Sequence, residues 1–528
     1  NTTQLPHSRF LFSKRSGASQ RSGSGKAGKD FWERFKYMSE QRIDIERMEQ
    51  AAALFGSLDE NVHLLCNEFH VSIVGRDSEL KVSGEPEDVA LAVRAIESLL
   101  GLINRGEALT EQNVRYCISL VREGGEEKLT ALSKEIWEYA EPGLKEKKSS
   151  AAIAKFLEEE GFRVQLGVGT VPTAICAEYG EGHPVIAYLG EYDSLPRLNQ
   201  TVSCHKELKY PDEPEHSGHG CGHNNLGVGA VGAAIMLKDA IVAGKVKGTV
   251  RFYGCPAEEL LVGKVFMVRD GAFNGVDCAL TWHSHAYCGA WGACYTCMNS
   301  VKFHFHGKAA HAAGHPFDGR SALDAVELMN VSATYMREHV KPDVRLHYAT
   351  ICSCAPNVVP DECSVWYYIR APKRKDVDEV YSWLVDCAKG AALMTQTKFD
   401  IEFLTGCSEV MPNDVLEKVM LQAYKDTGAP KFTPEDYEFA KKMAETYPEV
   451  LARDRRIMKE EYGVNGDDKF LCDVVFDKVI EDRLVAPGST DVVDVSHVVP
   501  TYQIYVAGQG IGCPGHSWQM TAYSGSHV

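Results

Sequence analysis

The alternation of apolar and polar positions changes character along the chain. Within residues 38–125, "FHVSIVGRDSELKVSGEPEDVALAVRAIESLLGLI" predicts a strand, a turn at residues 75–77, a second strand and an amphipathic helix. From about residue 126 the spacing is helical with a break at Pro142, and the apolar strand candidates "TAICAEYG" and "PVIAYLGEYDSLP" follow. Strands that alternate with helices predict an α/β layer with a mostly parallel sheet.

Residues 298–405 follow another order. "NSVKFHFHG" is typical of a strand, and a helix is predicted over 321–339. "RLHYATICSCAPNVVPDECSVWYYIRAP" then supplies two strands, and a helix over 377–392 precedes the last strand. This is the order of a ferredoxin-like α+β unit, so we expect a small lid inserted into the α/β layer.

These changes predict the organisation of the whole chain. After Gly406 the sequence returns to helical, charge-rich segments, of which 430–470 is polar enough for a surface insertion. The expected segments are a flexible basic tail (1–37), a small α/β domain (38–125), the first part of a catalytic domain (126–297), a lid (298–405) and the second part of the catalytic domain (406–528).

Composition and charge restrict the class of protein. The 528 residues are 44% hydrophobic and 24% charged, which is typical of a folded protein of several domains. The net charge of −17 argues against a general nucleic-acid or anionic-membrane binder, although the Ser/Gly-rich tail is locally basic. The 17 cysteines lack small-domain disulfide spacing, and we find neither a signal-peptide pattern nor an apolar run of membrane length. We therefore expect a cytoplasmic protein.

Four short motifs carry side chains that bind metals. Cys221 and His223 lie in "SGHGCGHNNLGVG", and a glutamate pair lies in "GCPAEEL". "ALTWHSH" and "CPGHSWQ" add further histidines. Each motif follows a predicted strand or a glycine-rich turn, where loops at one sheet edge could meet. Two divalent metals need several N, O or S donors from separate loops, so together these motifs favour a metal site over a histidine-rich loop.

The motifs also identify a family. "HGCGHNNLGVGAVGAA", "FYGCPAEE", "ALTWHSH", "HGKAAHAAGHPFDGRSALDAVELMNV", "PNVVPDECSVWYYIRAP", "GSTDVVDVSHVVPT" and "GHSWQ" resemble, in order, the dinuclear-metal amidohydrolase and carboxypeptidase family that includes aminoacylases. The resemblance runs from about residue 128 to 528, and within the family it is strongest to the p-aminobenzoyl-glutamate hydrolase group. It implies a catalytic α/β domain with an inserted lid and dimerisation domain.

The resemblance implies a set of metal ligands and a reaction. Two divalent ions, Zn or Mn, would be held by Cys221 as bridging ligand and by His223, Glu259, His283 and His516. Glu258 would be the general base, and a metal-bridging hydroxide would attack the amide of an N-acyl amino acid, such as p-aminobenzoyl-glutamate, or of a dipeptide-like substrate. His285 shares a strand face with His283, but the family motif ends at His283.

The resemblance also assigns roles to the lid. It implies a homodimer in which a lid histidine stabilises the oxyanion in the partner's site; His311 is the expected residue and His315 the alternative. Asn357 and Arg370 match the family's substrate-binding pair. The chain ends soon after His516, where the family normally continues through a closing helix.

Several polar residues near the motifs receive plainer interpretations. Asp193 is expected to orient a ligand without binding metal, and His219 to make a hydrogen bond within its loop. Asn224 stands where many aminoacylases have Asp. For His497 a pocket-lining role and a loop role stay equally open.

The N-terminal segment suggests an alternative function. Residues 38–125 resemble the small KH-like domain that precedes the ATPase domain of PhoH-type proteins, yet no Walker A motif follows. A nucleic-acid-associated protein acting through residues 1–125 is therefore the second hypothesis. It ranks lower because the segment has no G-x-x-G clamp between its predicted elements.

Overall fold

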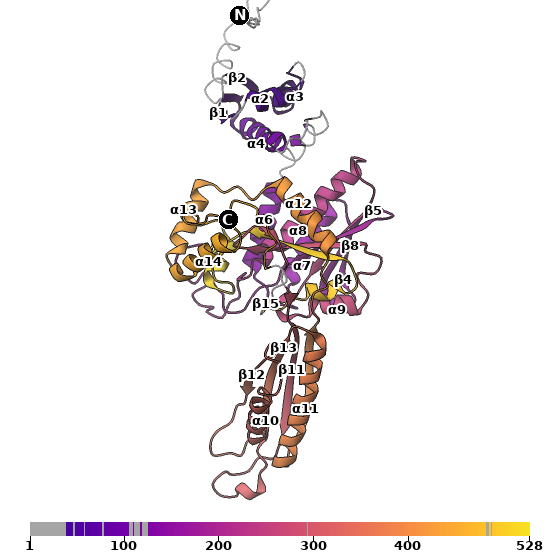
Figure 1. The fold of residues 1–528 in the computed structure, drawn as a ribbon, viewed down its shortest axis with the longest axis vertical. Helices are drawn as coiled ribbons and strands as arrows, with labels where there is room; N and C mark the ends of the chain where they lie inside the picture. The colour runs from indigo at the N-terminus through magenta and orange to yellow at the C-terminus, as the bar shows by residue number, and fades with distance from the viewer. Residues whose placement is uncertain are drawn as a thin grey trace, which may run out of the picture. The chain divides into compact units, whose positions relative to one another are not determined.

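The computed structural model describes residues 39–45, 48–56, 59–76, 79–104, single positions between 109 and 118, and then 125–292, 294–481, 485–486 and 488–528. The chain forms two compact units that divide after Gly125. The expected basic tail lies outside the described residues. Figure 1 shows the elements of each unit.

The first unit is a three-stranded antiparallel sheet with helices. The strand–turn–strand–helix pattern expected here is present, and a further strand adds to the sheet, whose order is β1-β3-β2. Apolar side chains including Leu65, Leu80 and Ile96 form its core. The elements are β1 (Ser39–Asp44), α2 (Met48–Phe55), α3 (Glu60–Phe69), β2 (Ser72–Arg76), β3 (Glu79–Gly84) and α4 (Pro86–Asn104).

The second unit is built on a seven-stranded sheet of order β4-β5-β7-β6-β8-β16-β9. The central strands β7, β6, β8 and β16 are parallel, whereas β4, β5 and β9 are antiparallel. The prediction of a mostly parallel sheet is therefore right only for the centre, because β4 and β5 are joined by a tight hairpin, which forces antiparallel pairing. The strands are β4 (Arg163–Val168), β5 (Val171–Glu181), β6 (Val185–Glu191), β7 (Gly248–Cys255), β8 (Cys278–His285), β9 (Gly289–Ala290) and β16 (Thr501–Ala507).

Helix α8 (His223–Val242) packs on this sheet and carries part of the site. It is long and apolar enough to cross a membrane, with a mean hydropathy of 1.5, which the search for apolar runs missed. In the structure it packs on β6 and β7 as a core helix and buries Leu226 and Val231. Gly227 makes the packing possible, since a Cβ there would lie 2.5 Å from the backbone oxygen of Glu191.

The remaining helices of the catalytic part surround the sheet. Helix α16 follows His516 and is largely buried, so a closing helix packs behind that histidine. The helices are α6 (Gly125–Tyr139), α7 (Lys147–Glu159), α9 (Gly263–Arg269), α12 (Asp414–Thr427), α13 (Pro434–Ala444), α14 (Pro448–Glu460), α15 (Val492–Ser496) and α16 (Trp518–Ser524).

Helices α13 and α14 correct the expectation of a surface insertion at 430–470. One face of this helix pair enters the core cluster beside β16 through Ala440, Met443, Tyr447, Leu451 and Met458. These positions are spaced by three to four residues or a multiple of a turn, as on one face of a helix. The segment is polar overall because its outer faces carry the charges.

The lid is a four-stranded antiparallel sheet of order β12-β13-β11-β14, and the expected strand–helix–strand–strand–helix–strand order is confirmed. Alternate side chains are buried along β13 and along β11 from Val301 onward, so the two helices cover one face there, whereas the first residues of β11 are buried on both faces. In Figure 1 the lid extends away from the seven-stranded sheet. Its elements are β11 (Cys297–His306), α10 (Ala322–Met336), β12 (Arg345–Ile351), β13 (Glu362–Ala371), α11 (Arg374–Thr395) and β14 (Lys398–Cys407).

Candidate metal centre

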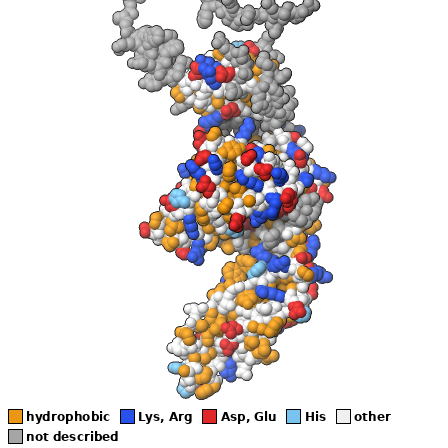
Figure 2. All heavy atoms as spheres, turned by 60° about the vertical axis from the view of Figure 1, so that its left-hand side comes forward, with side chains coloured by type: hydrophobic (Ala, Val, Ile, Leu, Met, Phe, Trp, Pro, Cys, Tyr) orange, Lys and Arg blue, Asp and Glu red, His pale blue; other side chains and the backbone are white. Residues whose placement is uncertain are grey.

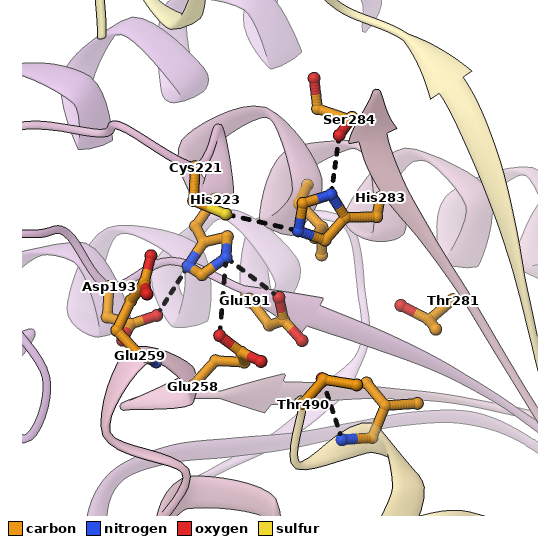
Figure 3. Close-up of polar contacts among 12 residues, drawn as sticks. Glu191, Asp193, Cys221, His223, Glu258, Glu259, Thr281, His283, Ser284 and Thr490 are labelled. Atoms are coloured by element: carbon orange, nitrogen blue, oxygen red, sulfur yellow. Dashed lines mark hydrogen bonds and ion pairs between the residues drawn. The ribbon is translucent and has the colours of Figure 1, made fainter. Parts of the chain in front are cut away.

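The candidate site lies where the central strands end. Strand β6 ends at Glu191, β7 leads to Glu258 in a short 3-10 helix, and His283 stands near the end of β8. Helix α8 begins at His223 beside them. Open α/β sheets place sites at the carboxyl ends of parallel strands, and Figure 3 shows the side chains turned toward one another there.

The turn into α8 positions Cys221 and His223. Gly222 has φ 80°, a conformation that favours glycine, and it allows the sulfur and the imidazole to face the same space. Cys221 Sγ lies 3.5 Å from His283 Nε2. The other ring nitrogen of His283 is 2.7 Å from the backbone oxygen of Ser284, which fixes the orientation of the ring.

The possible donor atoms fall into three groups, in each of which the ligand atoms lie within 4.8 Å of one another. Two groups share the Cys221 sulfur: Cys221 with His223 and His283, and Cys221 with Glu259 and His516. The third group is Glu191, His223 and Glu258. The structure thus brings together all five residues expected to bind metal. His223 Nε2 and Glu259 Oε1 are buried and lack a hydrogen-bond partner among the described residues, which is what two coordinating atoms need. The donor set therefore fits a pair of divalent ions, with Cys221 belonging to two of the donor groups.

Asp193 holds two of these residues in place. One carboxylate oxygen is 2.9 Å from His223 Nδ1, and the other accepts a hydrogen bond of 3.0 Å from the backbone nitrogen of Glu259. This leaves His223 Nε2 facing the donor cluster. The arrangement is the orienting contact expected of Asp193.

Protonation in the centre depends on burial and on neighbouring charge. Removal from water raises the pKa of the Cys221 thiol to about 12, so this sulfur becomes a thiolate only beside a cation. Burial likewise raises the pKa of Glu259 to about 7 and lowers the pKa of His283 below its usual value. A neutral imidazole is the form that binds metals.

Glu258 is almost completely buried beside the donor groups. The preceding residue, Ala257, has φ 56°, and its backbone nitrogen donates a 2.8 Å hydrogen bond to the buried carboxylate of Glu146. Burial, and then the negative charges of Glu191 and Asp491, raise the pKa of Glu258 well above its usual value. These surroundings increase the proton affinity of the carboxylate, and a perturbed, buried carboxyl group beside the donor atoms is a candidate for proton transfer.

A buried ion-pair network lies next to Glu258. Lys264 is fully buried, and its ammonium is 2.7 Å from Glu191 Oε1 and in contact with Asp491. The second oxygen of Glu191 lies 3.3 Å from His223 Nε2, so one carboxylate links the lysine to the donor cluster.

The sequence motifs did not predict this network. Glu191 and Asp491 stand inside the motifs "GEYDSLP" and "GSTDVVDVS", which could have drawn attention to them. Lys264 in "GKVF" gives no signal, because a single lysine usually lies at the surface.

The other histidines near the centre make structural contacts. His219 is buried and makes a hydrogen bond as expected, but its partner is outside its loop: Nε2 lies 3.1 Å from the backbone oxygen of Ile136 in α6. His285 stacks on Tyr505 with ring centroids 4.2 Å apart. His497 Nε2 is 2.6 Å from the backbone oxygen of Glu409, a loop contact.

The lid residues expected to act in the site lie near opposite ends of β13. His311 is exposed and forms a β-bridge with Val358, and the backbone nitrogen of Ala312 donates a 3.1 Å hydrogen bond to the backbone oxygen of Asn357. Arg370 lies at the other end of β13, where it donates a 3.0 Å hydrogen bond to Ser489 Oγ of the catalytic part.

One chain therefore does not bring the expected substrate-binding pair together. Asn357 precedes β13, which begins at Glu362. From Glu362 to Arg370 the strand alone spans roughly 25 Å, at about 3.3 Å per residue. Asn357 lies beside the segment of His311 instead. The sequence motifs could not reveal this, since they give no distance along the lid.

Comparisons with known proteins agree with the fold and identify the family. Residues 298–393 match the model of the M20 peptidase dimerisation domain. The chain is 39% identical over 413 residues to a subunit of the p-aminobenzoyl-glutamate hydrolase of Escherichia coli (strain K12), covering 76% of this chain and 85% of that protein. It is 31% identical over 320 residues to the Xaa-Arg dipeptidase of Mus musculus, covering 57% and 68% respectively.

A solved structure shows the same architecture. The crystal structure of the aminobenzoyl-glutamate utilization protein from Klebsiella pneumoniae superposes with a TM-score of 0.50 at 17% identity. The match covers 76% of this chain and 95% of that one. It confirms a catalytic domain with an inserted lid.

Proposed function

Because the chain belongs to the M20 family of metal-dependent peptidases and amidohydrolases, we propose that it cleaves the amide bond of an N-acyl glutamate, with p-aminobenzoyl-glutamate as the first candidate. Metal-dependent hydrolysis of an amide is the reaction of this enzyme; the identity of the substrate is the proposal. The observation that carries it is the pair of donor groups sharing Cys221 beside the buried Glu258.

The donor set is proposed to hold two divalent ions. Thiolate, imidazole and carboxylate ligands together suit zinc or manganese. Such ions, when bound, polarise the scissile carbonyl and lower the pKa of a coordinated water toward neutrality. Cys221, His223, His283, Glu259 and His516 would hold them, and Cys221 belongs to both of the donor groups that these residues form.

Glu258 is proposed to move the protons. Its carboxylate takes a proton from the attacking water and later gives it to the nitrogen of the leaving amine. Burial and the negative charges of Glu191 and Asp491 raise its pKa, which strengthens it as a proton acceptor, while the charge of bound cations would favour the ionised form that starts the reaction.

The lid offers groups that match an aromatic acyl group and a carboxylate. The guanidinium of Arg370 lies 5.6 Å from the ring of Tyr368, which packs edge-on against Trp366 on the same face of the sheet. A guanidinium fork binds a carboxylate through two parallel hydrogen bonds, and aromatic rings pack against an aryl group. These residues support an aryl-acyl glutamate as substrate.

A homodimer through the lid is proposed on the basis of exposed apolar side chains. Strand β12 is an edge of the lid sheet, and exposed apolar side chains occur along the lid in Figure 2. Tyr335 of α10 is 73% exposed and Ile351 of β12 is 50% exposed, and a second copy would cover them. In such a dimer, His311 and Asn357 of one chain would enter the site of the other.

The cysteines bear on localisation, and the comparisons bear on the alternative function. All 17 cysteines are free, which supports the proposal of a reducing cytoplasm. The alternative of a nucleic-acid-associated protein acting through residues 1–125 is not supported by the comparisons.

A substrate screen tests the proposal. We expect the purified chain to release p-aminobenzoate from p-aminobenzoyl-glutamate faster than it cleaves N-acetyl amino acids or dipeptides. A chelator should abolish the activity, and added zinc or manganese should restore it. Faster cleavage of a simple dipeptide, or activity unaffected by the chelator, would contradict the proposal.

A further inference from the structure

Three thiols gather at the junction of β12 and β13 in the lid. Cys352 follows the last residue of β12, Cys354 lies two positions further in the loop, and Cys363 is the second residue of β13. Cys352 Sγ lies 3.7 Å from Cys354 Sγ, and the last strand pair, Ile351 with Ser364, places Cys363 opposite Cys352 in register. The metal centre does not use these residues, and no sequence motif accounts for them.

The three thiols differ in access. Cys354 is exposed and Cys352 is half-buried, whereas Cys363 is buried in the lid core. Burial raises the pKa of Cys363 to about 12, and the hydrogen bond with Cys352 raises the pKa of the exposed Cys354 as well. Access therefore decides which thiols react: a solute reaches Cys352 and Cys354 but not the buried Cys363, and mildly alkaline pH supplies the reactive thiolate.

The loop after these thiols carries part of the candidate site. Asn357 follows Cys354 by three residues, and its backbone oxygen accepts the hydrogen bond from Ala312, next to His311. The nitrogen of Val359 donates a 2.9 Å hydrogen bond to the backbone oxygen of Ala310. A covalent link at the start of the loop would therefore act on the segment that holds Asn357 beside His311.

We propose that Cys352 and Cys354 form a reversible disulfide when a peroxide oxidises them, and that this link slows hydrolysis by changing the position of the Asn357 loop. A disulfide needs a sulfur–sulfur distance of about 2.05 Å, so the sulfurs must approach by roughly 1.7 Å. Residues 353–356 are exposed, which leaves room for that movement. The effect on hydrolysis rests on the proposed function of the lid residues.

The chemistry balances with one peroxide. The Cys354 thiolate attacks one peroxide oxygen, and the oxygen–oxygen bond breaks. The other oxygen departs and takes up a proton to become water, and Cys354 becomes a sulfenic acid. Cys352 Sγ then attacks that sulfur, the sulfur–oxygen bond breaks, and a second water leaves. Two thiols lose two electrons and two protons, and the peroxide is reduced to two waters. A thiol reductant reverses the link by exchange.

Peptide mapping tests the link directly. The full chain, loaded with metal, is treated with hydrogen peroxide at mildly alkaline pH, alkylated, and digested with trypsin and with a protease that cuts before Asp361. Trypsin leaves 346–370 intact, because no Lys or Arg lies inside it, and the second cut separates Cys363 from the other two thiols. The expected product is peptide 346–360, unalkylated and two hydrogen masses lighter.

Other products would overturn the inference. A link between peptides 346–360 and 361–370 would assign the bond to Cys363, and a disulfide between two chains would assign it to the dimer. Sulfinic acid without any link would contradict it as well. Cys354→Ser should abolish the product, and Cys363→Ser should leave it unchanged.

Rates of hydrolysis test whether the disulfide between Cys352 and Cys354 slows the enzyme. Peroxide should lower the rate of the wild-type enzyme several-fold, and dithiothreitol should restore it. Cys354→Ser should keep its rate under peroxide, although Cys221 is still present; an equal loss in this variant would assign the effect to another thiol and overturn the coupling. If no acyl amino acid is hydrolysed at all, the proposed function fails while the mapped link is still observed.

Discussion

Lys264 donates hydrogen bonds to the carboxylate of Asp491 from both its backbone nitrogen and its ammonium, and both side chains are completely buried. The same ammonium contacts Glu191, so one positive charge stands between two carboxylates beside Glu258. Burying a charge is costly unless it is paired. The network therefore fixes loops from β6, from the start of α9 and from the segment before α15 to one another.

Replacing Lys264 by Met should destabilise the catalytic part strongly. The change leaves Glu191 and Asp491 buried without a cation, and removal of one partner of such a pair costs about 3–5 kcal/mol. Urea unfolding of the variant should show this loss. The double variant Lys264→Met/Asp491→Asn removes one of the unpaired charges and should recover part of the lost free energy of unfolding. An equal loss in both variants would refute the idea that unpaired buried charge causes the destabilisation.

Replacing Glu258 by Gln should separate proton transfer from metal binding. We expect kcat to fall by roughly 10²- to 10⁴-fold, as for loss of a general base, with little change in KM or in metal content. Glu259→Gln is the matched comparison, because it should lower metal content instead. Metal analysis beside steady-state kinetics distinguishes them, and loss of metal in Glu258→Gln would contradict these roles.

The sequence could predict residues that act through short motifs. Cys221 and His223 are two residues apart and the glutamate pair is adjacent, so each stands in a short motif, and the resemblance of these motifs to the family's implied their roles. Lys264 and Asp491 could not be paired in this way, because 227 positions separate them and only the folded sheet brings them together. Likewise, the polar composition of α13 and α14 concealed an apolar face that depends on helical periodicity.

Cys221→Ser should lower the metal content of both halves of the centre. A serine hydroxyl stays protonated near neutral pH and is a poor replacement for a bridging thiolate. With cobalt as a spectroscopic substitute, the thiolate-to-cobalt absorption band should be present in the wild-type protein and absent in the variant. Cys278→Ser, a change of a free cysteine outside the donor groups, should leave the band intact; a band that persists in Cys221→Ser would exclude this residue as a ligand.

The pH dependence of lid stability should depend on His306. This ring lies between Glu362, at 2.7 Å, and Asp400, and its hydrogen bonds to both raise the pKa of His306 above 6.5. A raised pKa in the folded state means that the stabilisation is fully present below the unfolded pKa and is lost as pH rises through the folded value. His306→Gln should therefore lower the melting temperature at pH 6 more than at pH 8.5; an equal decrease at both would contradict the assignment.

Mixed dimers should show whether His311 acts across the subunit interface. His311→Ala and Glu258→Gln should each be nearly inactive alone. In a mixed dimer, the site with an intact Glu258 would receive the intact His311 of the other chain, so one site of two works. Random pairing makes half of the dimers mixed, and about a quarter of the wild-type rate should return after co-expression. If His311 served its own chain, every site in the mixed dimer would lack one group and no activity would return. The rate of co-expressed variants, compared with a mixture of separately purified dimers that do not exchange, therefore decides between the two arrangements.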